Sequence, residues 1–306
     1  MRARLGVGLL LLVLWTGGSC SEGLPAVNGE RALERVRQQV AFGPRHPGTP
    51  GSAAIRDWMA SEVTRLGGRV ERQTFVDTVG GSLHTVVNVI GRFGPTTGRR
   101  IGLYAHYDTR PWSDMAATLA DRERPVPGAN DAASGVAVLL EVAELMSRQA
   151  PPVGVDLVFL DAEDSGLPSA PETYCRGSRG YALRLPPTGA PTRPVAGFLF
   201  DMVGDRDLAI HDEGYSVMRA TNLVEVVHEA ARATGARNFH RGVRHTVIDD
   251  HIPLLDAGLP TVDIIDFDYP WWHTPEDTPD KVSAESLAEV SRVAAWIVYR
   301  SALARP

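Results

Sequence analysis

Histidine and carboxylate residues stand at the ends of the apolar segments of this sequence, which is where binding groups gather in open α/β sheets. They are His106, Asp131, Glu163 with its neighbour Asp164, Asp201 and His273. Two histidines and at least three carboxylates make a mixed nitrogen and oxygen ligand set, which suits one zinc ion or a pair better than magnesium or calcium. No cysteine lies among these residues, so a thiolate zinc site is excluded.

Each of these residues also has an ordinary structural explanation. A histidine after a strand is commonly only hydrogen-bonded, Asp131 is placed to cap a helix, and adjacent acids such as Glu163 and Asp164 are typical of a solvated loop. Five separate segments nevertheless deliver such groups to one rim, which favours a site. Two adjacent acids in a turn can also divide the work, because one can bind a metal while the other acts as a base.

The elements that must position these groups follow from the hydrophobic pattern. Strands are expected at 70–76, 85–90, 101–105, 155–160, 197–200 and 261–265. Helices are expected at 30–42, from Ser52 as cap to about 66, and at 132–146, 221–233, 250–257 and 283–301. Strands alternating with helices predict an α/β three-layer sandwich around a central mixed, mostly parallel sheet, with the first two strands as an antiparallel pair at its edge.

Composition and the first residues indicate the compartment. Among 306 residues the net charge is −6, which argues against nucleic acid as a partner. Arg2 and Arg4, an apolar run over 5–15 and small residues before Cys20 predict a signal peptide over 1–19, either plainly cleaved or a lipoprotein signal. The protein is then expected outside the cytoplasm: periplasmic, anchored to the membrane only through a lipid on Cys20, or secreted.

The mature chain is expected to form one catalytic domain over 24–306, because the sequence contains no convincing linker and no internal repeat. Once Cys20 is lipidated or removed, Cys175 has no intrachain partner and is expected to be a buried, inert thiol. We expect a monomer, although the sequence leaves the oligomeric state open.

Five motifs in one order resemble a known family. They are Ala105-His-Tyr-Asp-Thr-Arg-Pro-Trp112, Gly128-Ala-Asn-Asp-Ala-Ala-Ser-Gly135, Leu160-Asp-Ala-Glu-Asp164, Asp249-Asp-His-Ile-Pro253 and Trp272-His-Thr274. Together they resemble the zinc aminopeptidase-like family that includes the animal-type glutaminyl cyclases, and particularly its bacterial cyclase branch. The resemblance covers nearly all of 30–300 and implies a fold of the phosphorylase/hydrolase-like type.

The resemblance also implies roles for individual residues. Asp131, Asp164 and His273 match the zinc ligands, and Glu163 matches the general acid/base. His106 and Asp201 match the ligands of the second zinc in two-metal peptidases, whereas in cyclases Asp201 belongs to a hydrogen-bonded acid network with Asp249. Trp272 matches an indole that contacts the substrate. His251 matches a motif position that we interpret as support for its loop.

The sequence departs from the mammalian cyclases in two places. The stretch 165–169 lacks the tryptophan that follows their acidic pair, so Tyr174 either covers the substrate instead or is an ordinary half-buried tyrosine. Asp263 stands where they have a histidine, which puts that part of their pocket in doubt.

Three functions remain open, in descending order. The first is a glutaminyl-peptide cyclotransferase with one zinc per chain, which converts the N-terminal glutamine of peptides or proteins to pyroglutamate and releases ammonia. The second is a two-zinc aminopeptidase, because every position that matches a zinc ligand of the two-metal peptidases carries a histidine or a carboxylate. The third is a non-catalytic binding domain on the same fold, against which stands the absence of any apolar replacement at a ligand position.

Overall fold

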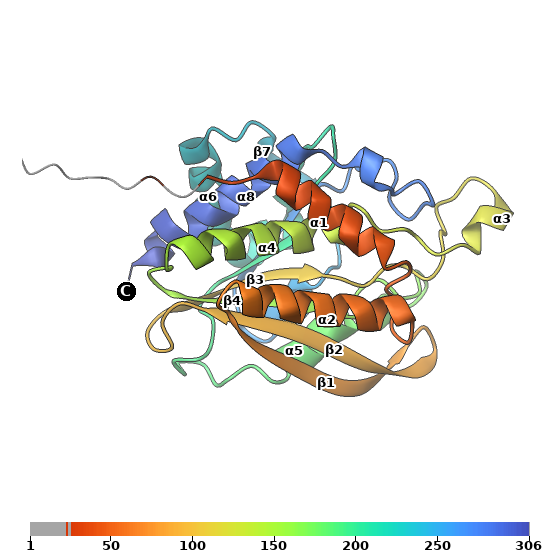
Figure 1. Ribbon diagram of the computed structural model, residues 1–306, viewed down its shortest axis with the longest axis horizontal. Coiled ribbons are helices and arrows are strands. Elements are labelled where there is room, and N and C mark those ends of the chain that lie inside the picture. The colour runs from red at the N-terminus through yellow and green to blue at the C-terminus, as the bar shows by residue number, and fades with distance from the viewer. Residues whose placement is uncertain (1–22, 24–25, 306) are drawn as a thin grey trace, which may run out of the picture.

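A six-stranded sheet forms the centre of the computed structural model, which describes residues 23 and 26–305 (Figure 1). Its strands are β1 (Arg69–Val79), β2 (Ser82–Phe93), β3 (Arg100–His106), β4 (Gly154–Leu160), β5 (Gly197–Asp201) and β8 (Thr261–Ile265). They lie in the order β1-β2-β4-β3-β5-β8. The pairs β1–β2 and β2–β4 are antiparallel and the other three are parallel. The predicted mixed, mostly parallel sheet is confirmed, with the antiparallel pair at its edge.

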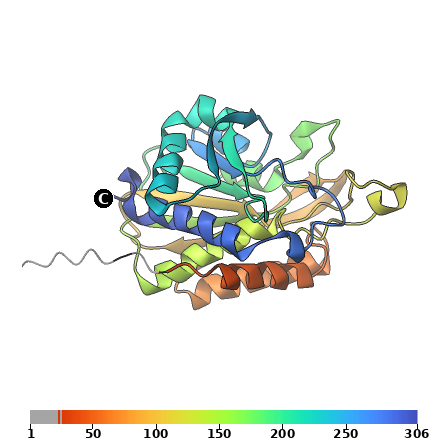
Figure 2. The same ribbon diagram turned by 90° about the horizontal axis from the view of Figure 1, so that it is seen from above.

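Helices cover both faces of this sheet. They are α1 (Gly29–Ala41), α2 (Pro50–Arg65), α3 (Leu119–Arg122), α4 (Ala133–Arg148), α5 (Arg176–Ala182), α6 (Gly214–Thr234), α7 (His251–Asp256) and α8 (Ala284–Arg300). Short 3₁₀ turns are η1 (Pro171–Thr173), η2 (Pro279–Lys281) and η3 (Ala302–Ala304). Figure 1 looks onto the layer that contains α1, α2 and α4, and in Figure 2 α1 and α2 form the lower edge of the molecule.

The alternation of side chains along the strands creates two cores. Leu103 and Ala105 of β3 belong to the large core beneath α4 and α8, while Tyr104 between them belongs to a smaller core that includes Tyr181 of α5 and Leu254 of α7. All seven residues of β3 are buried, and so are all seven of β4. Strands buried on both faces give the continuous apolar runs from which they were predicted.

The first two strands are longer than predicted and form one hairpin. Val79 pairs with Ser82, so the turn consists of Gly80 and Gly81, with φ values of 55° and 83°. Two consecutive residues with positive φ match the twist of a tight hairpin, and glycine adopts that conformation without strain.

The structure differs from the predicted elements in two places. The helix predicted from Ser52 is capped by Thr49, whose hydroxyl accepts the Ser52 N–H at 3.1 Å, and Pro50 occupies its first turn. A second, two-stranded parallel sheet, β6 (Ile210–Glu213) and β7 (Phe239–His245), was not predicted. Its strand β7 is mostly exposed and carries no apolar alternation that would reveal it.

The predicted signal segment 1–19 and Cys20 lie outside the described residues. Among the residues that the structure does describe, no helix combines the length and the apolar character that crossing a membrane requires.

Close packing of α4 on the sheet gives a first prediction. A Cβ added at Gly135 would lie 2.1 Å from the backbone oxygen of Phe200, so Gly135→Ala forces helix and strand apart. We expect a loss of about 1–3 kcal/mol in the free energy of unfolding, measured by urea denaturation, although alanine is the better helix former. Ser147→Ala, at an exposed position of the same helix, serves as control and should change stability by no more than about 0.5 kcal/mol. Equal stability of the two variants would contradict the packing argument.

Candidate active site

The sheet order places the carboxyl ends of β4, β3, β5 and β8 side by side, and the candidate residues follow from these ends. His106 closes β3, Glu163 and Asp164 lie in the loop after β4, and Asp201 closes β5. His273 belongs to the long loop after β8, and Asp131 lies two residues before α4. The structure brings all six residues together at one rim, and all are largely buried.

Two groups of ligand atoms share Asp131. The first contains His106, Asp131 and Asp201, and the second contains Asp131, Asp164 and His273; within each group the ligand atoms lie within 4.8 Å of one another. Asp131 turns one oxygen toward each histidine: Oδ1 lies 3.1 Å from Nε2 of His106, and Oδ2 lies 3.8 Å from Nε2 of His273. Asp131 therefore has the placement of a carboxylate that can serve either group or bridge both.

The residues of the second group are suited to a metal ion. Oδ1 of Asp164 lies 3.1 Å from Nε2 of His273, while its Oδ2 is buried without a hydrogen-bond partner. A buried carboxylate oxygen without a partner is costly, and a cation is the partner that it lacks. Histidine nitrogen and carboxylate oxygen both bind zinc, and three protein ligands leave the fourth position open, as in catalytic zinc sites.

Asp131 does not act as the helix cap that its position suggested. The N-cap of α4 is Ala132, without a side-chain hydrogen bond, and the peptide bond between Asp131 and Ala132 is cis. Asp277 instead holds the backbone here, because its carboxylate accepts the N–H groups of Asn130 at 2.8 Å and Asp131 at 3.2 Å. The Asp131 side chain is thereby left free to face the two histidines.

A second carboxylate, Asp108, fixes the acidic pair. It accepts the N–H groups of Glu163 at 3.0 Å and Asp164 at 3.1 Å. Sequence reasoning assigned no role to Asp108 or Asp277, since both act through backbone groups distant in sequence. The spacing His106-x-Asp108 was the one visible signal.

Glu163 has the surroundings of a group that handles protons. Burial, followed by the charge of Asp164, raises its pKa well above the usual range, while the charge of His106 opposes the shift. The thiol of Cys175 donates to its Oε1 at 3.4 Å, and the Cys175 N–H donates to the Glu163 carbonyl at 3.0 Å. Cys175 is a buried free thiol, as expected, and burial raises its pKa well above the usual value.

Backbone strain concentrates around these side chains. Ala162, Cys175, Met202 and His273 have φ values of 55°, 58°, 48° and 56°, a left-handed conformation that costs a residue with a Cβ atom about 1–3 kcal/mol. Ala162 and Cys175 adjoin or contact Glu163, and Met202 adjoins Asp201. His273 is itself a candidate metal ligand. Strained residues of this kind are typical of functional sites.

The predicted hydrogen bond between Asp201 and Asp249 is not found among the described residues. Asp201 instead bonds Nε2 of His106 at 3.1 Å, and Oδ2 of Asp249 is buried without a partner. The two acids interact through charge alone: burial, and then the Asp201 carboxylate, raise the pKa of Asp249 to about 7. A ring nitrogen that can donate is a better partner for Asp201 than a second carboxylate, and this explains the difference.

His251 lies at the start of α7 and is fully buried. Its Nε2 lies 3.2 Å from Glu213, a residue that also caps α6. With Asp249 and Asp263 it forms a further cluster behind the rim. This placement agrees with a supporting role for its segment.

A cavity of about 380 Å³ opens onto the acidic rim. Glu163, Asp164 and His273 lie on one side of it, and an apolar and aromatic wall includes Tyr174, Phe267 and Trp272. The Trp272 ring stacks on His273 with ring centres 3.8 Å apart. An apolar cavity with a few convergent polar groups is the usual form of a small-substrate site.

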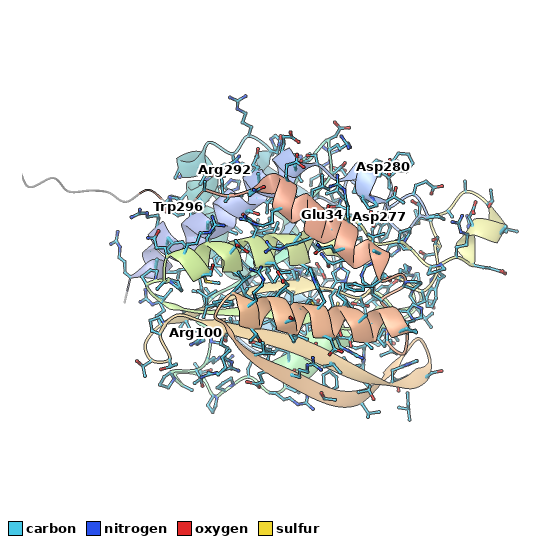
Figure 3. All side chains as sticks on the ribbon, in the orientation of Figure 1. Glu34, Arg100, Asp277, Asp280, Arg292 and Trp296 are labelled. Atoms are coloured by element: carbon cyan, nitrogen blue, oxygen red, sulfur yellow. The ribbon has the colours of Figure 1, made fainter. Side chains whose placement is uncertain are left out.

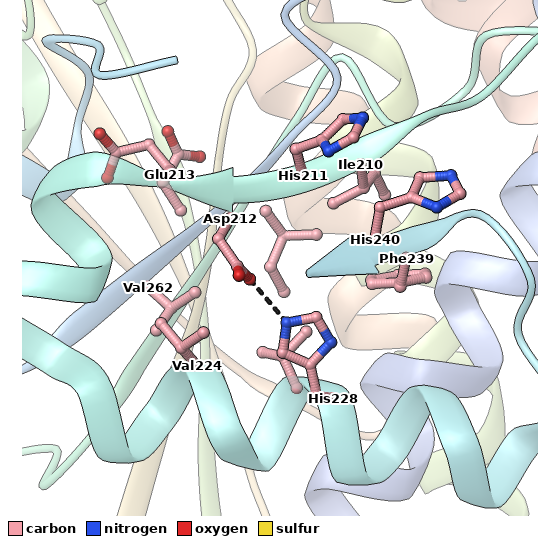
Figure 4. Close-up of a pocket in the computed structure, with 12 residues that line it drawn as sticks. Ile210, His211, Asp212, Glu213, Val224, His228, Phe239, His240 and Val262 are labelled. Atoms are coloured by element: carbon pink, nitrogen blue, oxygen red, sulfur yellow. Dashed lines mark hydrogen bonds and ion pairs between the residues drawn. The ribbon is translucent and has the colours of Figure 1, made fainter. Parts of the chain in front are cut away.

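A second cavity, between the small sheet and α6, cannot serve as a substrate site (Figure 4). It measures about 20 Å³, room for one water molecule. Its main polar feature is the pair Asp212–His228, with 2.6 Å between carboxylate oxygen and Nε2.

This fold, with paired histidine and carboxylate groups at the carboxyl edge of its sheet, defines a metal-dependent α/β enzyme. The family model described as Peptidase family M28 matches residues 88–298, and the chain belongs to that family.

Solved structures and curated relatives are similar to the chain over most of its length. Glutaminyl cyclase of Bacteroides thetaiotaomicron, bound to N-acetylhistamine, is 34% identical with a TM-score of 0.86; the match covers 91% of this chain and 100% of that one. A Zn-dependent exopeptidase of Parabacteroides distasonis is 33% identical with a TM-score of 0.87 over the same shares. Glutaminyl-peptide cyclotransferase of the snake Boiga dendrophila is 27% identical, covering 81% of this chain and 75% of its own length.

The ligand groups give a second prediction. His273→Ala should lose bound zinc, measured by metal analysis of the purified protein, because it removes the only nitrogen ligand of the second group. His251→Gln is the control and should retain zinc. Loss of zinc from His251→Gln with retention in His273→Ala would place the ion in the cluster behind the rim.

Proposed function

We propose that this chain is a zinc-dependent glutaminyl-peptide cyclotransferase acting on the N-terminal glutamine of peptides and proteins. The observation that carries the proposal is the likeness, over about nine tenths of the chain, to a solved glutaminyl cyclase at 34% identity. Curated relatives named glutaminyl-peptide cyclotransferase support it over 81% of the chain. The cavity beside Glu163 is large enough to admit the N-terminal residue of a peptide, and its lining combines aromatic and acidic side chains.

One zinc ion per chain is proposed, held by Asp131, Asp164 and His273. When bound, zinc supplies Lewis-acid polarisation of the γ-carboxamide carbonyl. The proposal leaves His106 and Asp201 as a hydrogen-bonded pair.

Glu163 is proposed as the proton carrier. The α-amine nitrogen forms a bond to the side-chain carbonyl carbon, and its proton passes to the Glu163 carboxylate. The same proton then goes to the amide nitrogen as the carbon–nitrogen bond breaks, so that ammonia leaves and the ring remains. Burial and the charge of Asp164 raise the pKa of Glu163, and a raised pKa makes a carboxylate a stronger proton acceptor than an exposed glutamate.

Trp272 and Tyr174 are proposed to hold the substrate. Both line the cavity, and Phe267 packs against Trp272 with ring centres 5.1 Å apart. An aromatic wall of this kind is proposed to hold the side chain in conformations in which its carbonyl carbon lies near the amine, because orientation is a large part of ring closure. Asp201 and Asp249 are proposed to complete the acidic surroundings of Glu163.

The remaining features of the proposal concern the whole protein. Residues 24–306 are proposed as one catalytic domain that works outside the cytoplasm after removal of the signal 1–19. It is then periplasmic, anchored through a lipid on Cys20, or secreted, and monomeric. Peptide and protein N-termini are its proposed partners.

A two-zinc aminopeptidase is the second candidate. The placement of Asp131 between His106 and His273 favours it, because a bridging carboxylate is what two adjacent ions require. The likeness to a Zn-dependent exopeptidase points the same way.

Substitution of Glu163 tests the proton carrier. Glu163→Gln should retain its fold and zinc but lose activity by roughly 10²–10⁴-fold, because an amide cannot accept the proton. Ammonia release from a glutaminyl peptide is the measurement, with metal analysis on the same sample. Near-normal turnover by the zinc-loaded variant would refute the role.

A paired assay decides between cyclase and peptidase. The protein should release ammonia from a glutaminyl peptide and leave a leucine anilide intact, with one zinc counted per chain. His106→Ala should lower the cyclase rate modestly and keep that zinc. Two zincs with anilide hydrolysis that His106→Ala abolishes would make the aminopeptidase the correct assignment.

A further inference from the structure

Arg110 is a fully buried arginine that lies beside the proposed metal ligands. Its Nε and Nη2 donate to the two oxygens of Asp114 at 2.8 and 2.6 Å. Its Nη1 donates to Oδ1 and to the backbone oxygen of Asp164 at 3.1 and 2.9 Å. One guanidinium thus fixes two carboxylates in a planar geometry that a lysine ammonium cannot reproduce.

Both carboxylates belong to the surroundings of the same proposed zinc ion. Asp164 is itself a proposed ligand, and Asp114 lies 3.1 Å from Nδ1 of His273. A carboxylate behind a metal-binding histidine accepts a hydrogen bond from its Nδ1–H, which keeps the proton on Nδ1 and leaves Nε2 unprotonated and directed at the metal. Nε2 is the nitrogen of His273 that faces Asp164 and Asp131.

The opposite charges of Arg110 and Asp114 lie in direct contact. Both oxygens of the Asp114 carboxylate accept hydrogen bonds from the Arg110 guanidinium, so this buried positive charge has a negative partner beside it. The pair therefore acts on the proposed ligands chiefly through its geometry.

The Arg110 side chain also contacts two aromatic rings, of which Tyr174 lines the cavity. The guanidinium carbon lies 5.0 Å from the centre of the Trp112 ring and 5.5 Å from that of Tyr174, within the range of cation–π contact. Arg110 therefore touches Tyr174, which lines the cavity, and Asp164, which is proposed to bind the ion.

We propose that Arg110 and Asp114 act together as the positioning pair of the metal site, placing Asp164 and His273 relative to each other and to the cavity wall. The inference rests on the proposed zinc ligands but not on the cyclase reaction. Neither residue is proposed to touch the substrate or the ion.

Zinc affinity of Arg110→Lys, measured by competition with a chromophoric chelator, tests the pair. We expect affinity about 10–100-fold weaker than in the wild type, because lysine keeps the charge but cannot hold both carboxylates. Cobalt in place of zinc should give an altered visible spectrum, since the ligands shift. Arg100→Lys is the matched control: Arg100 is also buried and bonds Asp156 at 2.7 Å, but it lies at the opposite end of β3 (Figure 3).

A merely structural role predicts another pattern. Arg110→Lys and Arg100→Lys would then lower the thermal unfolding midpoints of the metal-free proteins alike and leave zinc affinity and cobalt spectrum unchanged, which would overturn the proposal. If Arg110→Lys does not fold, Asp114→Asn, at a partly exposed position, should weaken zinc about tenfold or more, and wild-type affinity in that variant would equally overturn it. Zinc binding without cyclase activity in the wild type would refute the proposed function alone, whereas a wild type that binds no zinc would refute this inference as well.

Discussion

Repulsion between buried carboxylates is the interaction around which this structure is organised. Asp108, Asp131, Asp164, Asp201 and Asp277 are all buried at one edge of the sheet, beside Glu163. Anions brought this close in a medium of low dielectric are strongly unfavourable unless each finds a partner. The surrounding loops supply these partners, which are of three kinds.

Backbone N–H groups are the first kind, and they serve Asp108 and Asp277. Buried cations are the second: Arg110 bonds Asp114 and Asp164 directly, whereas Arg45 donates to backbone oxygens at 127 and 128, just before Asp131. The third is the histidine pair, and its arrangement decides the chemistry. Because Asp131 turns one oxygen toward each histidine, it belongs to both groups of candidate ligands.

Mainly apolar runs such as 101–105 and 155–160 made the strands and a mostly parallel sheet predictable, since strands buried on both faces leave few polar positions. The mostly exposed β7 left no such trace. Residue types and their positions also predicted the candidate metal ligands, but not the residues that hold those ligands in place. Asp277 bonds N–H groups nearly 150 residues away, and Asp249 lacks the partner that resemblance gave it. Thr49 and Ser52 are both good caps, and only Pro50 between them marked the true start of α2.

The wide separation of the ligands along the chain has a consequence for biosynthesis. Asp131 and His273 stand nearly half the sequence apart, and His273 follows the last strand to join the sheet. A partly folded chain, or one cut short before residue 273, cannot assemble the nitrogen and oxygen donors of the second group. A metal that binds only the finished fold stabilises that fold alone. A metal ion held by the second group would therefore distinguish finished molecules from incomplete ones.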